Sequence, residues 1–214
     1  KATCSFIVKV IGVAPSIVSP GTINVFSNAN SCDAAATYTA TETTGIPAST
    51  ITYSIAPGST FNVGSTPVTA TATNAVGTSQ VTFDVVVTDN VMPTINCVAN
   101  INEYATSASG ALVNYTAPTG SDNCTYTISQ TAGLASGSTF PIGTTTNTYE
   151  IVDASGNKAT CSFDVTITGL PPVIVSPGTV TANSDANSCS ATVTYAATET
   201  TAIPASTITY SIEP

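Results

Sequence analysis

Residues 81–88 of this 214-residue chain read VTFDVVVT, a run in which apolar side chains alternate with Thr and Asp. A period of two is typical of a β-strand that buries one face. Similar alternation occurs at residues 37–41, 50–55, 68–73 and 162–168. Clusters rich in Pro, Gly, Asn and Asp separate these runs and supply turn chemistry. The pattern therefore predicts an all-β fold, and short strands between frequent turns favour a β-sandwich.

The composition excludes several classes of partner. Charged residues make up 7% of the chain, His and Trp are absent, and 12 acidic residues against three basic ones give a formal charge of -9. Such a chain cannot neutralise phosphates, so nucleic acids and anionic membrane surfaces are excluded as partners. No apolar run approaches the roughly 20 residues that a membrane-spanning helix needs, so we predict no membrane insertion.

The sequence repeats itself at two levels. KATCSF at residues 1–6 returns at 158–163, an offset of 157, and about 39 of the 57 residue pairs at this offset are identical. A weaker repeat places GSTF at both 58–61 and 137–140, an offset of 79. The repeating unit is therefore a pair of related domains of about 78 residues each.

The repeats predict the domain boundaries. Residues 1–12 are expected to form the last strand of a preceding domain, 13–89 and 90–169 two whole domains, and 170–214 the first half of a further one. We expect this chain to be a segment of a longer tandem array, extended because each domain contacts mainly its neighbours along the same chain.

Residues 91–169 resemble the hyalin (HYR) repeat, an immunoglobulin-like domain of extracellular proteins and of giant surface adhesins of gliding Bacteroidota. The matching residues are PTINC at 93–97, VNYTAP at 113–118, SDNC at 121–124 and GSTFPIGTTTNTYEIVDASGNKATCSF at 137–163. Residues 13–89 match less well and lack three of the cysteines of the family pattern. The resemblance implies tandem immunoglobulin-like sandwiches with an adhesive or spacer role.

Six cysteines in a chain without His or a Cys-x-x-Cys pair favour disulfides and an oxidising, exported location over a zinc site. The immunoglobulin-like fold brings Cys97, Cys124 and Cys161 to one pole of their domain, and Cys32 to the facing pole of the preceding one. The family pattern has a cysteine both at the turn of Cys32 and at the turn of Cys124. Residues 13–89 keep only the one at Cys32, and residues 90–169 lack only the equivalent of that one. We therefore predict Cys97–Cys161 within a domain and Cys32–Cys124 between domains, with Cys4 and Cys189 pairing outside residues 1–214. The alternative, Cys97–Cys124 with Cys32–Cys161, stays open.

No metal site is predicted, and no cofactor, although calcium is a candidate. Asp89, Asp122 and Asp153 are expected to gather near one domain junction, and carboxylates suit Ca²⁺. Turn formation explains the same residues, because Asp153 can cap its own turn and Asp122 can form an Asx-turn beside Cys124. The chain also lacks a dense ladder of alternating Asp residues.

No enzymatic activity is predicted, because the chain has no His and its Asp and Glu residues are scattered. Glu42 and Glu199 occupy the same position in successive copies of the repeat, so they do not form a carboxylate pair within one site. The prediction is a structural and adhesive one: the stalk of a very large secreted cell-surface adhesin, of the gliding-motility type, which bears force and projects a distal binding region. Its partners would be neighbouring repeats and a surface polysaccharide or substratum. The alternative is a carbohydrate- or protein-binding module, or a spacer attached to an exported polysaccharide-degrading enzyme.

Overall fold

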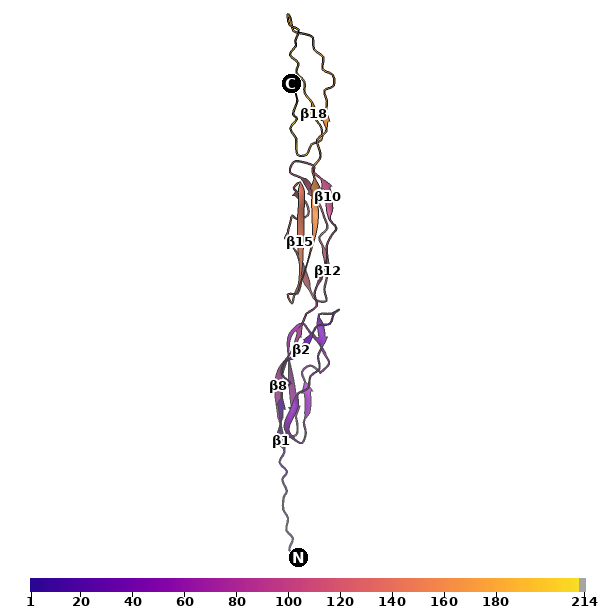
Figure 1. Ribbon diagram of the computed structural model, residues 1–214. Helices are drawn as coiled ribbons and strands as arrows, with labels where there is room; N and C mark the ends of the chain where they lie inside the picture. The colour runs from indigo at the N-terminus through magenta and orange to yellow at the C-terminus, as the bar shows by residue number, and fades with distance from the viewer. Residues whose placement is uncertain (212–214) are drawn as a thin grey trace. The chain divides into compact units, whose positions relative to one another are not determined.

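The computed structural model describes residues 1–211, and within them the chain forms strands and turns without any helix (Figure 1). The chain divides into two compact units, each made of three segments that are not contiguous in sequence. The first unit contains residues 1–93, 121–127 and 152–158; the second contains 94–120, 128–151 and the residues from 159 onward.

The first sandwich contains eight strands, β1 to β8. Its main sheet has the strand order β2-β8-β7-β5, and two small sheets pair β1 with β4 and β3 with β6. β2 runs parallel to β8, whereas β7 is antiparallel to both β8 and β5. The strands are β1 (Val13–Val18), β2 (Ile23–Phe26), β3 (Asp33–Ala35), β4 (Thr41–Ile46), β5 (Thr50–Tyr53), β6 (Thr60–Asn62), β7 (Gly64–Thr73) and β8 (Thr78–Thr88).

The second sandwich repeats this topology with the next eight strands. Its main sheet has the order β10-β16-β15-β13, and the small sheets pair β11 with β14 and β9 with β12. β10 is parallel to β16, as β2 is to β8. The strands are β9 (Thr94–Asn96), β10 (Ile101–Tyr104), β11 (Ala111–Val113), β12 (Thr119–Ser121), β13 (Tyr126–Ala132), β14 (Ser138–Phe140), β15 (Gly143–Asp153) and β16 (Lys158–Thr168). The all-β, tandem-sandwich prediction is thus confirmed.

Alternating burial along the long strands builds both cores. In β8, Phe83, Val85 and Val87 are buried, and the intervening positions face away from the core. β16 follows the same pattern with Phe163, Val165 and Ile167. Because one face of each strand is apolar, a slip of one residue in register would expose the whole set.

One of the predicted strands is wrong in an informative way. Residues 37–41 alternate in burial as expected, but β4 begins only at Thr41. The reason is that side chains replace the neighbouring strand here: the Ala40 amide donates to the Tyr53 hydroxyl at 2.9 Å, and the buried Tyr38 hydroxyl donates to the Ile55 carbonyl at 2.6 Å. Alternation therefore reports burial on one face, which an extended segment without a hydrogen-bonded partner strand also shows.

The 157-residue repeat is visible in local contacts. Ile17 pairs with Glu42 between β1 and β4, and Ile174 pairs with Glu199 between β17 (Ile174–Val175) and β18 (Thr198–Glu199). The carboxylate in each copy accepts a hydrogen bond from a Ser hydroxyl seven residues later, and each copy has a cis Ile-Pro bond. Identical sequence at this offset thus gives the same strand pairing twice.

The two ends of the chain contain little regular structure. Residues 1–12 form no strand, and the exposed apolar side chains among them include Phe6, Ile7 and Val8. From residue 170 onward, the described part of the chain contains β17, β18 and an isolated bridge between Leu170 and Ile203. The assignment of 1–12 and 170–214 to incomplete domains stays a prediction, and residues 212–214 lie outside the described residues.

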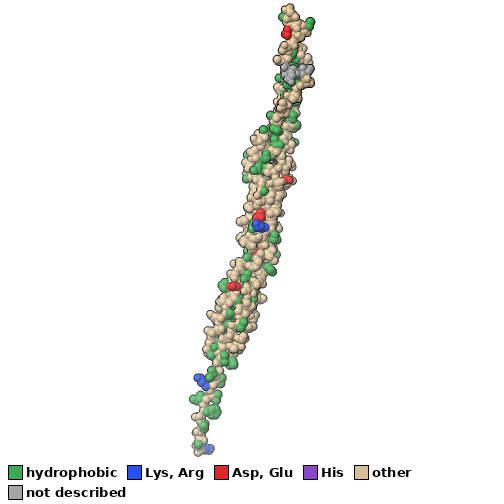
Figure 2. All heavy atoms as spheres, turned by 60° about the vertical axis from the view of Figure 1, so that its left-hand side comes forward, with side chains coloured by type: hydrophobic (Ala, Val, Ile, Leu, Met, Phe, Trp, Pro, Cys, Tyr) green, Lys and Arg blue, Asp and Glu red, His purple; other side chains and the backbone are tan. Residues whose placement is uncertain are grey.

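The surface carries few charges. On the face drawn in Figure 2, uncharged side chains cover most of the surface and the acidic and basic groups are sparse. Thr hydroxyls on adjacent strands contact each other instead, as Thr69 and Thr82 do at 3.1 Å and Thr144 and Thr166 do at 3.1 Å. Cross-strand pairs of this kind stabilise a sheet without any charge.

Replacing Phe140 by Ala should destabilise the second sandwich by about 3–5 kcal/mol, because the ring is fully buried and truncation leaves a cavity. Leu112→Ala on the neighbouring strand is the control, since that side chain is 64% exposed and its loss should change little. Urea unfolding followed by circular dichroism measures both variants. Equal destabilisation by the two changes would contradict this description of the core.

Tyr149 should make stability depend on pH in the alkaline range. Burial, together with the hydrogen bond and charge interaction with Tyr115, raises the pKa of Tyr149 to about 12. Because an unfolded Tyr ionises near about 10, the unfolded state loses this proton first, and stability falls as the pH rises from about 10 to about 12. Tyr149→Phe should flatten this part of the curve, and Tyr104→Phe, at a 64% exposed position, serves as the control. Unfolding free energies measured between pH 8 and pH 12 test this.

Candidate functional site

Two disulfides join loops and strands that are distant in sequence. Cys32, just before β3, bonds to Cys124 in the loop between β12 and β13, with a Cα–Cα distance of 4.7 Å. Cys97, just after β9, bonds to Cys161 in β16, with a Cα–Cα distance of 5.7 Å. Both distances lie in the usual range for disulfides. Among the described residues, Cys4 and Cys189 are free and exposed.

The Cys32–Cys124 bond lies inside the first compact unit, which includes the loop 121–127 and the turn 152–158. Both of these segments belong in sequence to the second sandwich. They pack against the end of β8 and the loop that follows β2, so a cluster of polar residues surrounds the bond. We call Ser27, Asp89, Asp122, Asn123, Asp153 and Asn157 the Asp89 cluster.

Asp89 is the centre of this cluster. It directly follows β8 and is only 4% exposed. Its Oδ1 accepts hydrogen bonds from the Ser27 hydroxyl at 2.7 Å, the Val91 amide at 3.1 Å and the Asn123 side chain at 3.3 Å. Burial by itself raises the pKa of Asp89, but these hydrogen bonds outweigh burial and hold the pKa below its ordinary value. Asp89 is therefore a buried anion at neutral pH.

Asn123 connects the loop 121–127 to two segments of the first sandwich. Its Nδ2 donates to Ser27 Oγ at 3.1 Å, to the Asn28 carbonyl at 3.0 Å and to the Ser31 carbonyl at 3.4 Å, besides Asp89. Because carbonyl and carboxylate oxygens only accept, the opposite orientation of the amide would place oxygen against oxygen. The contacts therefore fix which way the Asn123 side chain points.

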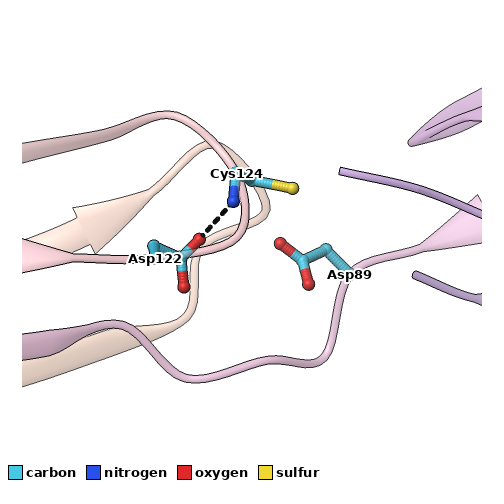
Figure 3. A group of neighbouring side chains, drawn as sticks. All are labelled: Asp89, Asp122 and Cys124. Carbon is cyan, nitrogen blue, oxygen red and sulfur yellow. Dashed lines mark hydrogen bonds between the residues drawn. The ribbon is translucent and has the colours of Figure 1, made fainter. Parts of the chain in front are cut away.

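The other two candidate acids form the turns that the sequence predicts. Asp122 Oδ2 accepts a hydrogen bond from the Cys124 amide at 2.9 Å, which closes an Asx-turn (Figure 3). Asp153 Oδ1 accepts from the amides of Ser155 at 2.9 Å and Asn157 at 2.8 Å, and its Oδ2 accepts from Asn157 Nδ2 at 2.7 Å. Both oxygens of Asp153 are therefore used within its own turn.

Three oxygen atoms of the cluster lack such partners. Asp89 Oδ2, Asp122 Oδ1 and Asn123 Oδ1 are buried and accept no hydrogen bond from the described residues. Ligand atoms of Asp89, Asp122 and Cys124 lie within 4.8 Å of one another, and the Asp89 carboxylate faces Asp122 (Figure 3). Since the Cys124 sulfur is bonded to Cys32, it is no thiolate, and the available donors here are oxygens.

Sequence reasoning named Asp89, Asp122 and Asp153 but missed two members of the cluster, Ser27 and Asn157. Asn157 Nδ2 donates to the Asp89 carbonyl at 3.2 Å as well as to Asp153. Asn157 carried a signal, because it ends the turn sequence DASGN. Ser27 carried none, since it is one hydroxyl in a chain rich in hydroxyls.

Glu42 and Glu199, the equivalent acids of successive repeats, each make hydrogen bonds with a nearby Ser, outside the Asp89 cluster. Glu42 accepts hydrogen bonds from the Ser49 amide at 3.2 Å and hydroxyl at 2.5 Å, and Glu199 accepts from the same groups of Ser206 at 3.4 Å and 2.8 Å. Glu42 thereby holds the loop between β4 and β5, and Glu199 makes the same contacts with the segment that follows β18.

Residues 1–211 contain no helix with the length and apolar character needed to cross a membrane.

The pairing of the cysteines can be tested by cleaving after Glu, because Glu42, Glu103, Glu150 and Glu199 separate the four bonded cysteines onto different peptides. Under non-reducing conditions, peptide 1–42 should stay linked to 104–150, and peptide 43–103 to 151–199. Mass spectrometry with Cys4 and Cys189 alkylated beforehand identifies the linked pairs. A link between 43–103 and 104–150 would overturn this pairing in favour of Cys97–Cys124.

Comparison with solved structures gives low similarity. Human protocadherin-24 EC1-2 aligns with 75% of this chain and 100% of its own, at 12% identity and a TM-score of 0.34. The titin domains Z1Z2, solved in complex with telethonin, align with 77% of this chain and 100% of theirs, at 14% identity and a TM-score of 0.34. The assignment of the fold therefore depends on the strand order and pairing of this chain.

Comparison of sequences gives a clearer result. Hyalin from Strongylocentrotus purpuratus is 34% identical over 213 residues, covering 77% of this chain and 17% of the hyalin. Hyalin from Lytechinus variegatus is 37% identical over 133 residues, covering 58% of this chain and 25% of the hyalin. The chain thus spans a quarter or less of the length of these relatives. Residues 88–167 match the HYR domain family, and together with the hyalins this match supports a HYR domain in the second sandwich.

Proposed function

We propose that this chain is a repeat segment in the stalk of a very large secreted cell-surface adhesin. In this role the sandwiches bear force along the chain and project a distal binding region, without enzymatic activity. The HYR match at residues 88–167 and the hyalin relatives support an extracellular adhesive repeat. The proposal further includes a very large size for the whole protein, its secretion and a role in gliding motility.

The observation that carries the proposal is structural repetition. Two sandwiches have the same strand order, and the β1–β4 contacts return in β17–β18 at an offset of 157 residues. An array built from such units grows by adding copies, and each copy needs contacts only with its neighbours. That property suits a spacer, whose length is set by the number of copies.

The two disulfides give this segment a short covalent path for force. Along the backbone, 129 residue steps separate Cys32 from Cys161. Through the two bonds, the shortest path runs from Cys32 to Cys124, back along the chain to Cys97, and across to Cys161, which is 27 residue steps. Tension applied at the ends therefore bypasses residues 33–96 and 125–160 as long as both bonds are intact.

A competing function is a module that binds carbohydrate or protein, or a spacer on an exported polysaccharide-degrading enzyme. Sugar-binding sites often stack exposed aromatic rings against the ligand. Here Tyr38 and Tyr149 are buried in the two cores, and Tyr115 donates to the Leu134 carbonyl at 2.6 Å. Tyr104 and Tyr126 are exposed, so a binding module would have to use these rings, and retention of the chain on immobilised polysaccharides would favour that function over the stalk.

Pulling a single chain from its two ends tests the proposal. At about 3.3–3.6 Å per residue, complete unfolding of the reduced chain should release about 350 Å more length than that of the oxidised chain. The reason is the difference between the two paths from Cys32 to Cys161. Optical tweezers or atomic force microscopy, with and without a thiol reductant, measure this length.

Cysteine variants provide matched controls for the pulling experiment. In C97S/C161S the path from Cys32 to residue 161 becomes 37 residue steps, and in C32S/C124S the path from residue 32 to Cys161 becomes 65. Four distinct lengths should therefore appear among the two variants and the oxidised and reduced chain. Equal extension of the oxidised and reduced chain, or sandwiches that unfold without measurable resistance, would count against a force-bearing stalk.

A further inference from the structure

We infer that Asp89, Asp122 and Asn123 form a calcium-binding site inside the first compact unit, beside the Cys32–Cys124 disulfide. This inference concerns a metal site and does not depend on the proposed stalk function.

The first argument is the state of the oxygen atoms. Each of the three side chains uses one terminal atom for hydrogen bonds and leaves a buried oxygen without a partner in residues 1–211: Asp89 Oδ2, Asp122 Oδ1 and Asn123 Oδ1. Asp89 is 4% exposed, so its unpaired oxygen is well shielded from bulk water. A buried polar atom without a partner destabilises the fold, and the cost is larger when the group is charged.

The second argument is that the side chains are held in place before any ion binds. Ser27 and Val91 fix the Asp89 carboxylate, the Cys124 amide fixes Asp122, and four acceptors fix the Asn123 amide. Because each side chain is held through its other atom, the unpaired oxygens are left available to a ligand. The disulfide adds a covalent link between the two segments that carry Asn123 and its acceptors.

Distances and charge favour Ca²⁺ as this ligand. Ca²⁺ binds oxygen atoms at about 2.3–2.6 Å, so two oxygens on one ion lie no more than about 5.2 Å apart. One carboxylate oxygen of Asp89 and one of Asp122 lie within 4.8 Å of each other, and Asn123 directly follows Asp122 in the chain. Two carboxylates match a divalent cation in charge, whereas a water molecule donates two hydrogen bonds at most and brings no charge.

The choice of metal follows from the ligand set. Carboxylate and amide oxygens are hard ligands, and the sulfur nearby is tied in a disulfide, which disfavours Zn²⁺. Mg²⁺ demands near-octahedral geometry at about 2.0–2.1 Å, whereas Ca²⁺ accepts six to eight oxygens in flexible arrangements, with water completing the shell. Asp153 lies beside Asp89 but contributes no unpaired oxygen, because both its oxygens accept hydrogen bonds in its own turn.

Calorimetric titration of the chelator-treated 214-residue chain with CaCl2 tests the site. We expect one Ca²⁺ per chain with a dissociation constant on the order of 10⁻⁴ to 10⁻³ M, the range of extracellular modules, and weaker binding of Mg²⁺. Asp89→Asn and Asp122→Asn should each weaken calcium binding by about tenfold or more. Asp84→Asn is the matched control, because it removes one exposed carboxylate outside the cluster and should leave the affinity unchanged.

Thermal unfolding separates a metal ligand from a purely structural residue. Without calcium, Asp89→Asn should lower the melting temperature, because hydrogen bonds in the folded state stabilise the Asp89 anion, whereas Asp122→Asn should change it little, because Asn can also accept the hydrogen bond of the Asx-turn. About 10 mM CaCl2, well above the expected dissociation constant, should raise the melting temperature of the parent chain and leave that of both variants nearly unchanged. Absence of saturable binding by the parent chain, unchanged affinity in both variants, or equal destabilisation of the variants with and without calcium would each overturn the site.

Discussion

The antiparallel pairing of β7 with β8 is the interaction on which the first sandwich depends. Its register runs without interruption from Gly64 opposite Val87 to Thr73 opposite Thr78, and it buries Val68, Ala70, Phe83 and Val85 on one face. The strands at the edges, β2 and β5, attach to this pair. The same ladder places Asp89 immediately after the last paired residues, so the position of the polar cluster is fixed by the core.

The sequence was sufficient to predict several strands and the Asp153 turn, because these depend on residues close together in the chain. The alternation at residues 81–88 and 162–168 lies within β8 and β16, and the turn chemistry of Asp153 involves only Ser155 and Asn157. Residues 37–41 show the limit of such reasoning. Their burial alternates, yet whether they form a strand depends on which groups satisfy the backbone, and Tyr53 and Ile55 decide that from the next segment of the chain.

The candidate site could be predicted only in part for the same reason. Asp89 and Asp122 can be named from the sequence as acids near one junction, but the unpaired oxygens follow from burial and from the hydrogen bonds of Ser27 and Asn123. Asn123 lies 96 residues from Ser27, and the Cys32–Cys124 bond has a sequence separation of 92. Contacts at such separations leave no periodic signal in the sequence. Neutral hydroxyl and amide groups donate to the buried Asp89 anion, so no basic residue in the sequence marks Asp89 as buried.

The two disulfides overlap along the chain, since Cys97 lies inside the loop closed by Cys32 and Cys124, and Cys124 lies inside the loop closed by Cys97 and Cys161. A protease that cuts one peptide bond anywhere between Cys32 and Cys161 therefore leaves the two products joined by at least one bond. Outside the cell, a protein is exposed to proteases, and a cleaved copy cannot be resynthesised where it stands. With this arrangement, one cut at any peptide bond from Cys32 to Cys161 leaves residues 1 and 214 in one covalent molecule.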